Sequence, residues 1–101
     1  MKKVLIIDDN EDNLQTTAEI LELSNYKVIT ASGGKAGLEQ AIKNEPDLIL
    51  CDIMMPELDG YAVLHMVQKI AELEQTPFIF VTAKTERSEI RRGCRLVPMI
   101  I

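Results

Sequence analysis

The stretch that decides the fold reads DLILCDIMMPELDG and covers residues 47–60. Its first part, Asp47 to Cys51, is a short continuous apolar run, which is typical of a strand buried on both faces of a parallel sheet. Asp52 follows directly. Asp59 precedes a segment of helical period, where its short carboxylate can cap the first turn. The stretch therefore predicts a buried strand, an acidic turn and the start of a helix.

Outward from this stretch, apolar runs alternate with segments of helical period. We predict further strands at residues 4–7, 27–30 and 78–81, and helices at 11–24 and 33–43, the latter ended by Pro46. A fourth helix is predicted to begin at Thr85 or Ser88 and to end at Gly93, because glycine favours the position after a helix. This alternation indicates βαβ units and an α/β fold with a parallel sheet.

Each predicted helix has an apolar face that we expect to be buried. In the first helix this face comprises Leu14, Thr17, Ala18 and Leu21. In the second it comprises Leu38, Ala41 and Ile42. In the third, after Asp59, it comprises Leu64, Val67, Ile70 and Ala71. The spacing in each set follows the helical period of three to four residues.

The bulk properties indicate one globular domain. The chain has 101 residues, of which 47% are hydrophobic and 27% are charged. The formal net charge of −5 argues against a nucleic-acid or anionic-membrane partner. Asp8 and Asp9 interrupt the first apolar run before it reaches the length of a signal peptide or a membrane span. We therefore expect a cytoplasmic protein.

Cys51 and Cys94 have no CxxC spacing and no histidine pair nearby. Buried, reduced thiols are therefore favoured over a disulfide or a zinc site.

Polar residues follow three of the predicted strands: Asp8 and Asp9 follow the first, Asp52 the third and Thr82 the fourth. The carboxyl ends of parallel strands meet at one edge, so these side chains should converge there. Two carboxylates about 4 Å apart repel by roughly 4 kcal/mol at an effective dielectric of about 20, so the cluster predicts a cation. Oxygen ligands without His or Cys favour Mg²⁺. The alternative is that Asp8 and Asp9 cap the first helix and that Asp52 only begins a turn.

Three strings carry a family resemblance: Ile6-Ile7-Asp8-Asp9-Asn10, the residues 52–60 quoted above, and Val81-Thr82-Ala83-Lys84. In this order and spacing they resemble the receiver domains of bacterial response regulators, over residues 1 to about 96. The resemblance implies a flavodoxin-like, doubly wound parallel sheet, truncated after about the fourth β/α unit. It also implies a signalling protein of a two-component phosphorelay, not an enzyme.

The resemblance implies a role for each matching residue. Asp52 would accept a phosphoryl group from a sensor histidine kinase or phosphotransfer protein, which makes an aspartyl phosphate. Asp9 would bind Mg²⁺ directly and Asp8 largely through water, while Asp52 and the backbone carbonyl of Met54 would complete the protein ligands. Thr82 would be the switch hydroxyl that moves to the phosphoryl oxygen.

Four other residues are candidates for roles beside these. Pro56 and Gly60 would shape the loop after Asp52. Lys84 is a candidate for the cation that contacts the phosphoryl group, although the corresponding lysine of the family follows a fifth strand. His65 is the only histidine in the sequence, and we expect a solvated helix residue there instead of a phosphorelay histidine.

The carboxyl end departs from the family pattern. Residues 97–101 read VPMII, where receivers usually have Gly-Ala-Asp-Asp-Tyr and then a strand with Lys-Pro. One base added before the Val97 codon permits the usual residues in the shifted frame, which suggests a single-base deletion after Leu96. We therefore expect an incomplete receiver domain over residues 1–101, family-like to about residue 96, with an aberrant tail and impaired switching.

Three functions compete. A phosphoacceptor receiver leads. An Mg²⁺-dependent phosphatase with an aspartate nucleophile usually needs a second acid where this chain has Met54. A vestigial receiver that acts only as an interaction or dimerisation module is the third. An exposed sheet edge and the apolar tail Leu96–Ile101 further predict a homodimer, unless the tail folds back within its own chain.

Overall fold

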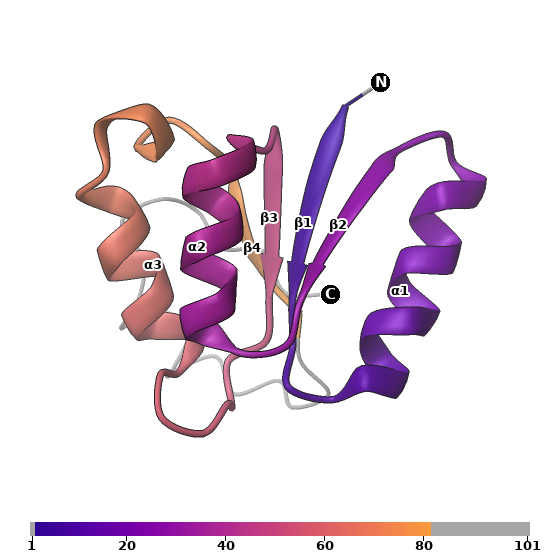
Figure 1. The fold of residues 1–101 in the computed structure, drawn as a ribbon, viewed down its shortest axis with the longest axis horizontal. Coiled ribbons are helices and arrows are strands. Elements are labelled where there is room, and N and C mark those ends of the chain that lie inside the picture. The colour runs from indigo at the N-terminus through magenta and orange to yellow at the C-terminus, as the bar shows by residue number, and fades with distance from the viewer. Residues whose placement is uncertain (1, 82–101) are drawn as a thin grey trace.

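The computed structural model describes residues 2–81, and its strands and helices alternate along the chain (Figure 1). The elements are β1 (Lys3–Ile7), α1 (Glu11–Leu23), β2 (Lys27–Ala31), α2 (Gly34–Asn44), β3 (Leu48–Cys51), α3 (Gly60–Gln68), a 3₁₀ turn η1 (Ala71–Leu73) and β4 (Phe78–Phe80). The predicted α/β alternation is therefore confirmed. Each strand and helix boundary differs from its prediction by no more than one residue, except at the C-terminal end of α3.

The four described strands form one parallel sheet in the order β2-β1-β3-β4. Val4 of β1 pairs with Val28 of β2 on one side and with Leu48 of β3 on the other. The chain thus adds β2 on one side of β1 and then β3 on the opposite side. Helix α1 covers one face of the sheet, and α2 and α3 cover the other (Figure 1). This is the predicted doubly wound, flavodoxin-like arrangement.

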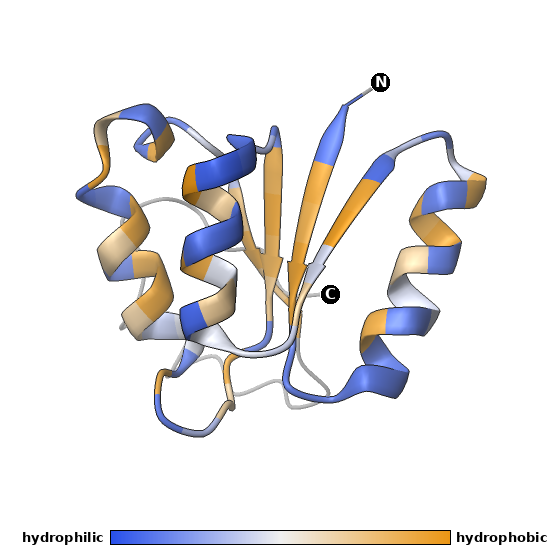
Figure 2. Cartoon of the chain, in the orientation of Figure 1, coloured by the Kyte–Doolittle hydropathy of each residue, from blue (hydrophilic) through white to orange (hydrophobic). Residues whose placement is uncertain are grey.

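The core consists of two apolar layers that the sheet separates. Leu5 and Ile7 of β1 pack in the layer under α2 and α3, while Val4 and Ile6 pack in the layer under α1. All four side chains are at most 4% exposed, and burial of each such side chain contributes about 1.5–3 kcal/mol. Figure 2 shows the result: the strands are apolar, and hydrophilic residues lie on the outer faces of the helices.

Helix α1 has a well-defined cap at each end. The Asn10 side chain accepts a hydrogen bond from the Asn13 amide at 3.1 Å, so Asn10 is the N-cap, not Asp8 or Asp9. At the other end the Tyr26 amide donates to Leu21 and the Asn25 amide to Glu22, which is the Schellman pattern. Asn25 has φ 68°, a conformation that asparagine tolerates better than most residues.

The prediction that Ile42 of α2 lies in the core is wrong. Ile42 is 57% exposed, although its spacing from Leu38 suggested an inward position. The buried face of this helix is formed by Gly34, Gly37 and Ala41. Ile42 is one residue beyond Ala41, and a step of one residue turns the side chain by about 100°.

Helix α3 ends earlier than the apolar period suggested. It stops at Gln68, and the Lys69 and Ile70 amides donate to carbonyls three residues back, which tightens the last turn. Ile70 is therefore only half-buried and Ala71 is exposed. Leu73 of η1 fills the core in their place and is fully buried.

Several predicted features lie outside the described residues. They are Thr82, Lys84, the predicted fourth helix, Cys94 and the tail Leu96–Ile101. Among the described helices, none has the length and apolar character needed to cross a membrane.

Candidate functional site

The sheet brings three aspartates to one edge. Asp8 and Asp9 follow β1, and Asp52 follows β3, which is the neighbouring strand. The ladder extends into these residues, since the Asp8 amide donates to Ala31 at 3.1 Å and the Asp52 amide to Ile7 at 2.9 Å. The backbone of each strand end is thus fixed by the sheet. The site lies where the chain switches sides of β1, the usual ligand position in such folds.

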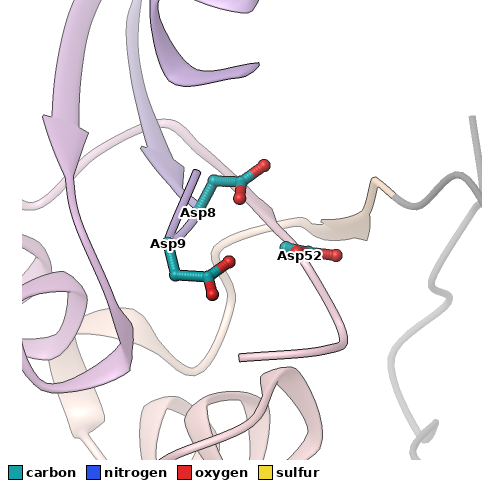
Figure 3. Close-up of side chains that lie close together, drawn as sticks. All are labelled: Asp8, Asp9 and Asp52. Carbon is teal, nitrogen blue, oxygen red and sulfur yellow. The ribbon is translucent and has the colours of Figure 1, made fainter. Parts of the chain in front are cut away.

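The three carboxylates form a compact cluster (Figure 3). One oxygen from each of Asp8, Asp9 and Asp52 lies within 4.8 Å of the others. Asp8 is 8% exposed, Asp52 is half-buried and Asp9 is exposed. The cluster is therefore anchored in the protein at Asp8 and open to solvent at Asp9, an arrangement that a small ligand can reach.

Backbone amides stabilise the charged form of two of these side chains. The Asn10 amide donates to Oδ1 of Asp8 at 2.9 Å. The backbone amides of Ile53 and Met54 favour the charged form of Asp52 and act to lower its pKa. The bond from Asn10 orients the Asp8 carboxylate. The three amides were not among the residues predicted from the sequence, because a backbone donor leaves no mark on residue type.

Burial nevertheless outweighs these hydrogen bonds. Burial is the largest cause that raises the pKa of Asp8, and the charge of Asp9 adds to it. Burial likewise raises the pKa of Asp52, followed by the charge of Asp8. Protein groups alone thus leave the ionised carboxylates under-compensated, and a cation at the cluster would supply the missing compensation.

The donor chemistry of the cluster fits Mg²⁺. Cys51 is adjacent, but burial, followed by the charge of Asp52, raises the pKa of its thiol far above the usual range. Its Sγ donates to the Asp52 carbonyl at 3.2 Å. The thiol therefore stays protonated and the donors are all oxygens, which suits a hard cation. The prediction of a buried, reduced thiol is confirmed for Cys51.

The loop between β3 and α3 depends on Gly60. A Cβ at this position would lie 2.4 Å from the Asp52 carbonyl oxygen and 2.9 Å from Ile53 Cα, so only glycine permits this approach. The Gly60 amide donates to Ile53 at 2.9 Å and closes the loop. The Met54 side chain is 61% exposed, while the role of its carbonyl as a metal ligand stays a prediction.

Two further predictions concern α3. Asp59 is its N-cap as predicted, since Oδ1 accepts from the Ala62 amide at 2.9 Å. His65 is exposed in the last turns of this helix. The expectation of a solvated helix residue is therefore confirmed.

A parallel doubly wound sheet with an acidic cluster at its carboxyl edge defines a class of small α/β domains. The family model described as the response regulator receiver domain matches residues 4–96. This range is most of the chain, and the chain therefore belongs to the response regulator receiver family.

Curated relatives agree with this assignment. The polar-differentiation response regulator DivK of Brucella ovis is 38% identical over 95 residues, which are 91% of this chain and 77% of that protein. DivK of Brucella anthropi is equally similar, with 38% identity over 95 residues.

Solved structures share the fold. The chemotaxis protein CheY4 of Vibrio cholerae has a TM-score of 0.92 at 28% identity, over 99% of this chain and 83% of that one. The response regulator TrrA of Thermotoga maritima, in complex with Mg²⁺-BeF, has a TM-score of 0.81 at 29% identity, over 88% of this chain and 76% of that one.

Proposed function

We propose that this receiver domain takes a phosphoryl group onto Asp52 from a sensor histidine kinase or phosphotransfer protein, with Mg²⁺ held at the cluster. The observation that carries the proposal is the approach of three carboxylate oxygens within 4.8 Å of one another. Asp8, Asp9 and Asp52 would supply side-chain oxygens, and Met54 its backbone carbonyl. The family membership and the Mg²⁺-BeF complex of TrrA support this choice of ion.

The chemistry asks little covalent work of the protein. An oxygen of Asp52 attacks the phosphorus, the bond from phosphorus to the donor histidine nitrogen breaks, and that nitrogen keeps the electron pair. Phosphoryl transfer of this kind depends on positioning and on neutralisation of charge. The amides of Ile53 and Met54 favour the charged form of Asp52, which is the nucleophilic form. Bound Mg²⁺ would supply positive charge beside the transferred group.

We propose Thr82 as the hydroxyl that responds to the modification. A phosphoryl group adds about −1.5 to −2 charges and three acceptor oxygens, which attract a nearby donor. Thr82 follows β4 in the sequence by two residues. Because β4 pairs with β3, which leads into Asp52, a residue just after β4 is well situated for this role.

We further propose a cytoplasmic homodimer without nucleic-acid or membrane partners. The net charge of −5 disfavours binding to anionic surfaces. Among the described strands β4 is at an edge of the sheet, and the sequence after it ends in the apolar segment Leu96–Ile101. Either the edge or the tail could join two copies.

The central experiment is Mg²⁺-dependent labelling by an acyl phosphate of low molecular weight, followed by mass spectrometry of the intact chain. We expect one phosphoryl group on the wild type, and none on Asp52→Asn or after removal of Mg²⁺ by a chelator. A folded wild-type chain that takes up no label would contradict the proposal and favour an interaction module.

A further inference from the structure

We propose that Gly34, the first residue of α2, is a positioning residue for the acidic site, because it allows the backbone of Leu58 to close against the helix. This inference rests on the proposed Mg²⁺ site and adds a residue that lies outside the metal and phosphoryl ligands. The contact joins α2 to the β3–α3 loop, residues 52–59, which begins with Asp52. Figure 1 shows α2 starting at the end of the sheet where this loop lies.

The loop is anchored firmly at its two ends. The Asp52 amide bonds to Ile7 at 2.9 Å, and the Gly60 amide bonds to Ile53 at 2.9 Å. Ile53 and Met55 are buried, with 6% and 8% of their surface exposed. These contacts fix where the loop leaves β3 and where it enters α3.

The middle of the loop has much weaker support from within. Its one described backbone bond joins the Leu58 amide to the Pro56 carbonyl at 2.7 Å, across Glu57 with φ 68°. A three-residue turn with a positive central φ is an uncommon, strained conformation, and at Glu57 it lacks the freedom of glycine. Such a turn persists only where its surroundings hold it in place.

Gly34 is the neighbour that holds it. A Cβ built on Gly34 would lie 2.7 Å from the Leu58 carbonyl oxygen, 2.9 Å from Leu58 Cβ and 3.0 Å from Val63 Cγ2. The first of these atoms belongs to the backbone and cannot rotate aside, so any larger residue at position 34 must displace the loop. The turn therefore packs against the backbone of α2 at Gly34, where no side chain intervenes.

Displacement of the loop would change the position of Asp52, the residue with which the loop begins. Leu58 and Met54 lie in the same loop, which begins at Asp52, and the backbone carbonyl of Met54 is a proposed metal ligand. A cavity of about 220 Å³ lies beside the contact and is lined by Asp9, Gly34, Pro56 and Leu58, among others. The Gly34–Leu58 contact and Asp9, a proposed metal ligand, thus line the same cavity. We therefore expect a change at the start of α2 to alter the geometry of the site.

Gly37 offers a matched control in the same helix. A Cβ at Gly37 would lie 2.5 Å from Ile7 Cδ1 and 2.7 Å from Ile7 Cγ1. Gly37→Ala therefore introduces the same methyl group and a clash at least as close, but the clash falls on the buried side chain of Ile7 instead of on the backbone of the loop. Both variants perturb packing, and only Gly34→Ala acts on the loop.

The test measures the thermal midpoint of unfolding as a function of Mg²⁺ concentration for the wild type, Gly34→Ala and Gly37→Ala, and derives the Mg²⁺ dissociation constant of each. We expect Gly34→Ala to weaken Mg²⁺ binding about tenfold, the size usual for residues that orient ligands. Gly37→Ala should lower the metal-free midpoint and leave the Mg²⁺ dissociation constant within about twofold of the wild-type value. Equal Mg²⁺ binding by the wild type and Gly34→Ala would overturn the inference alone, whereas a wild type that binds no Mg²⁺ would overturn the proposed function with it.

A second variant reaches the contact from the loop. Leu58→Gly removes the Leu58 Cβ that faces Gly34 and frees the turn, while α2 keeps its sequence. If Gly34→Ala fails to fold, weakened Mg²⁺ binding by folded Leu58→Gly supports the inference, and unchanged binding overturns it.

Discussion

At the scale of single residues, the fold changes the ionisation of two carboxyl groups of the site, those of Asp8 and Asp52. Burial raises the pKa of each, and neighbouring carboxylates add to the effect. The folded chain therefore holds protons on these groups at pH values where the unfolded chain, with an ordinary aspartate pKa of 3.8, has already released them. The two charges destabilise the metal-free fold at neutral pH.

This predicts a specific dependence of stability on pH in the absence of metal. As the pH falls through the raised pKa values of Asp8 and Asp52, the folded state takes up protons first, so these two groups contribute increasing stability. The contribution is complete below the ordinary aspartate value of 3.8 and is lost again as the pH rises. Urea unfolding in chelator across the acidic range measures it.

Two variants separate this effect from that of other acids. Asp52→Asn should stabilise the metal-free chain at neutral pH and flatten the pH dependence, because the under-compensated charge is removed. Glu39→Gln, which alters an exposed acid on α2, should do neither. Identical pH profiles for the wild type and Asp52→Asn would contradict the prediction.

Mg²⁺ should reverse this destabilisation, and Asp9 should be central to the reversal. A ligand at ten times its dissociation constant stabilises a fold by roughly 1.4 kcal/mol, which raises the midpoint of a domain this small by about 6–10 °C. Asp9→Asn should remove most of that rise, since Asp9 is the exposed carboxylate of the cluster. Differential scanning calorimetry with and without Mg²⁺ decides the matter, and a full rise in Asp9→Asn would exclude Asp9 as a ligand.

At the scale of elements, the start of α3 depends on one side chain. Oδ1 of Asp59 accepts from the Ala62 amide at 2.9 Å. Asp59→Ala should cost about 1 kcal/mol of stability, the usual cost of a lost N-cap, while Asp59→Ser should keep most of it. Chemical denaturation of the two variants provides the measurement. Equal stability of the wild type and Asp59→Ala would show that the bond adds nothing.

Most elements could be predicted from their apolar period, and the failures are confined to one position of α2 and to the end of α3. The period of α3 runs on to Ile70 and Ala71, but the helix tightens after Gln68 and the core is completed by Leu73. No local signal specifies that change, because it depends on how the chain must turn to enter β4. Ile42 was predicted to be buried since it is apolar, whereas the glycines that form the buried face of α2 have no hydropathy signal.

The residues of the acidic site were easier to predict than the contacts that hold them in position. The proximity of Asp8, Asp9 and Asp52 could be predicted because the ends of neighbouring parallel strands share one edge of the sheet. Which of the adjacent Asp8, Asp9 and Asn10 caps α1 could not be predicted, since it depends on where β1 stops pairing. The approach of Leu58 to Gly34 depends on how α2 and α3 dock, and residue types alone do not encode that distance.

At the scale of the whole molecule, the sheet order places β4 at an edge among the described strands. A strand at the edge of a sheet and the apolar segment Leu96–Ile101 both favour association, so we expect dimers to form as concentration rises. Sedimentation velocity over a concentration series measures this, and Ile100→Asp should weaken the dimer if the tail takes part. A strict monomer at high micromolar concentration would contradict the proposed homodimer.

The central position of β1 also determines the order in which the protein can fold during synthesis. Among the described strands β1 is translated first, yet its two neighbours are β2 and the later β3. The ribosome must therefore release the first strand long before its second partner exists, and β1 stays half-paired until Leu48–Cys51 emerge. Asp52 is the next residue to appear. The acidic cluster can thus form only once the nascent chain has emerged as far as Asp52, whereas β4 emerges later and is not needed to bring the three carboxylates together.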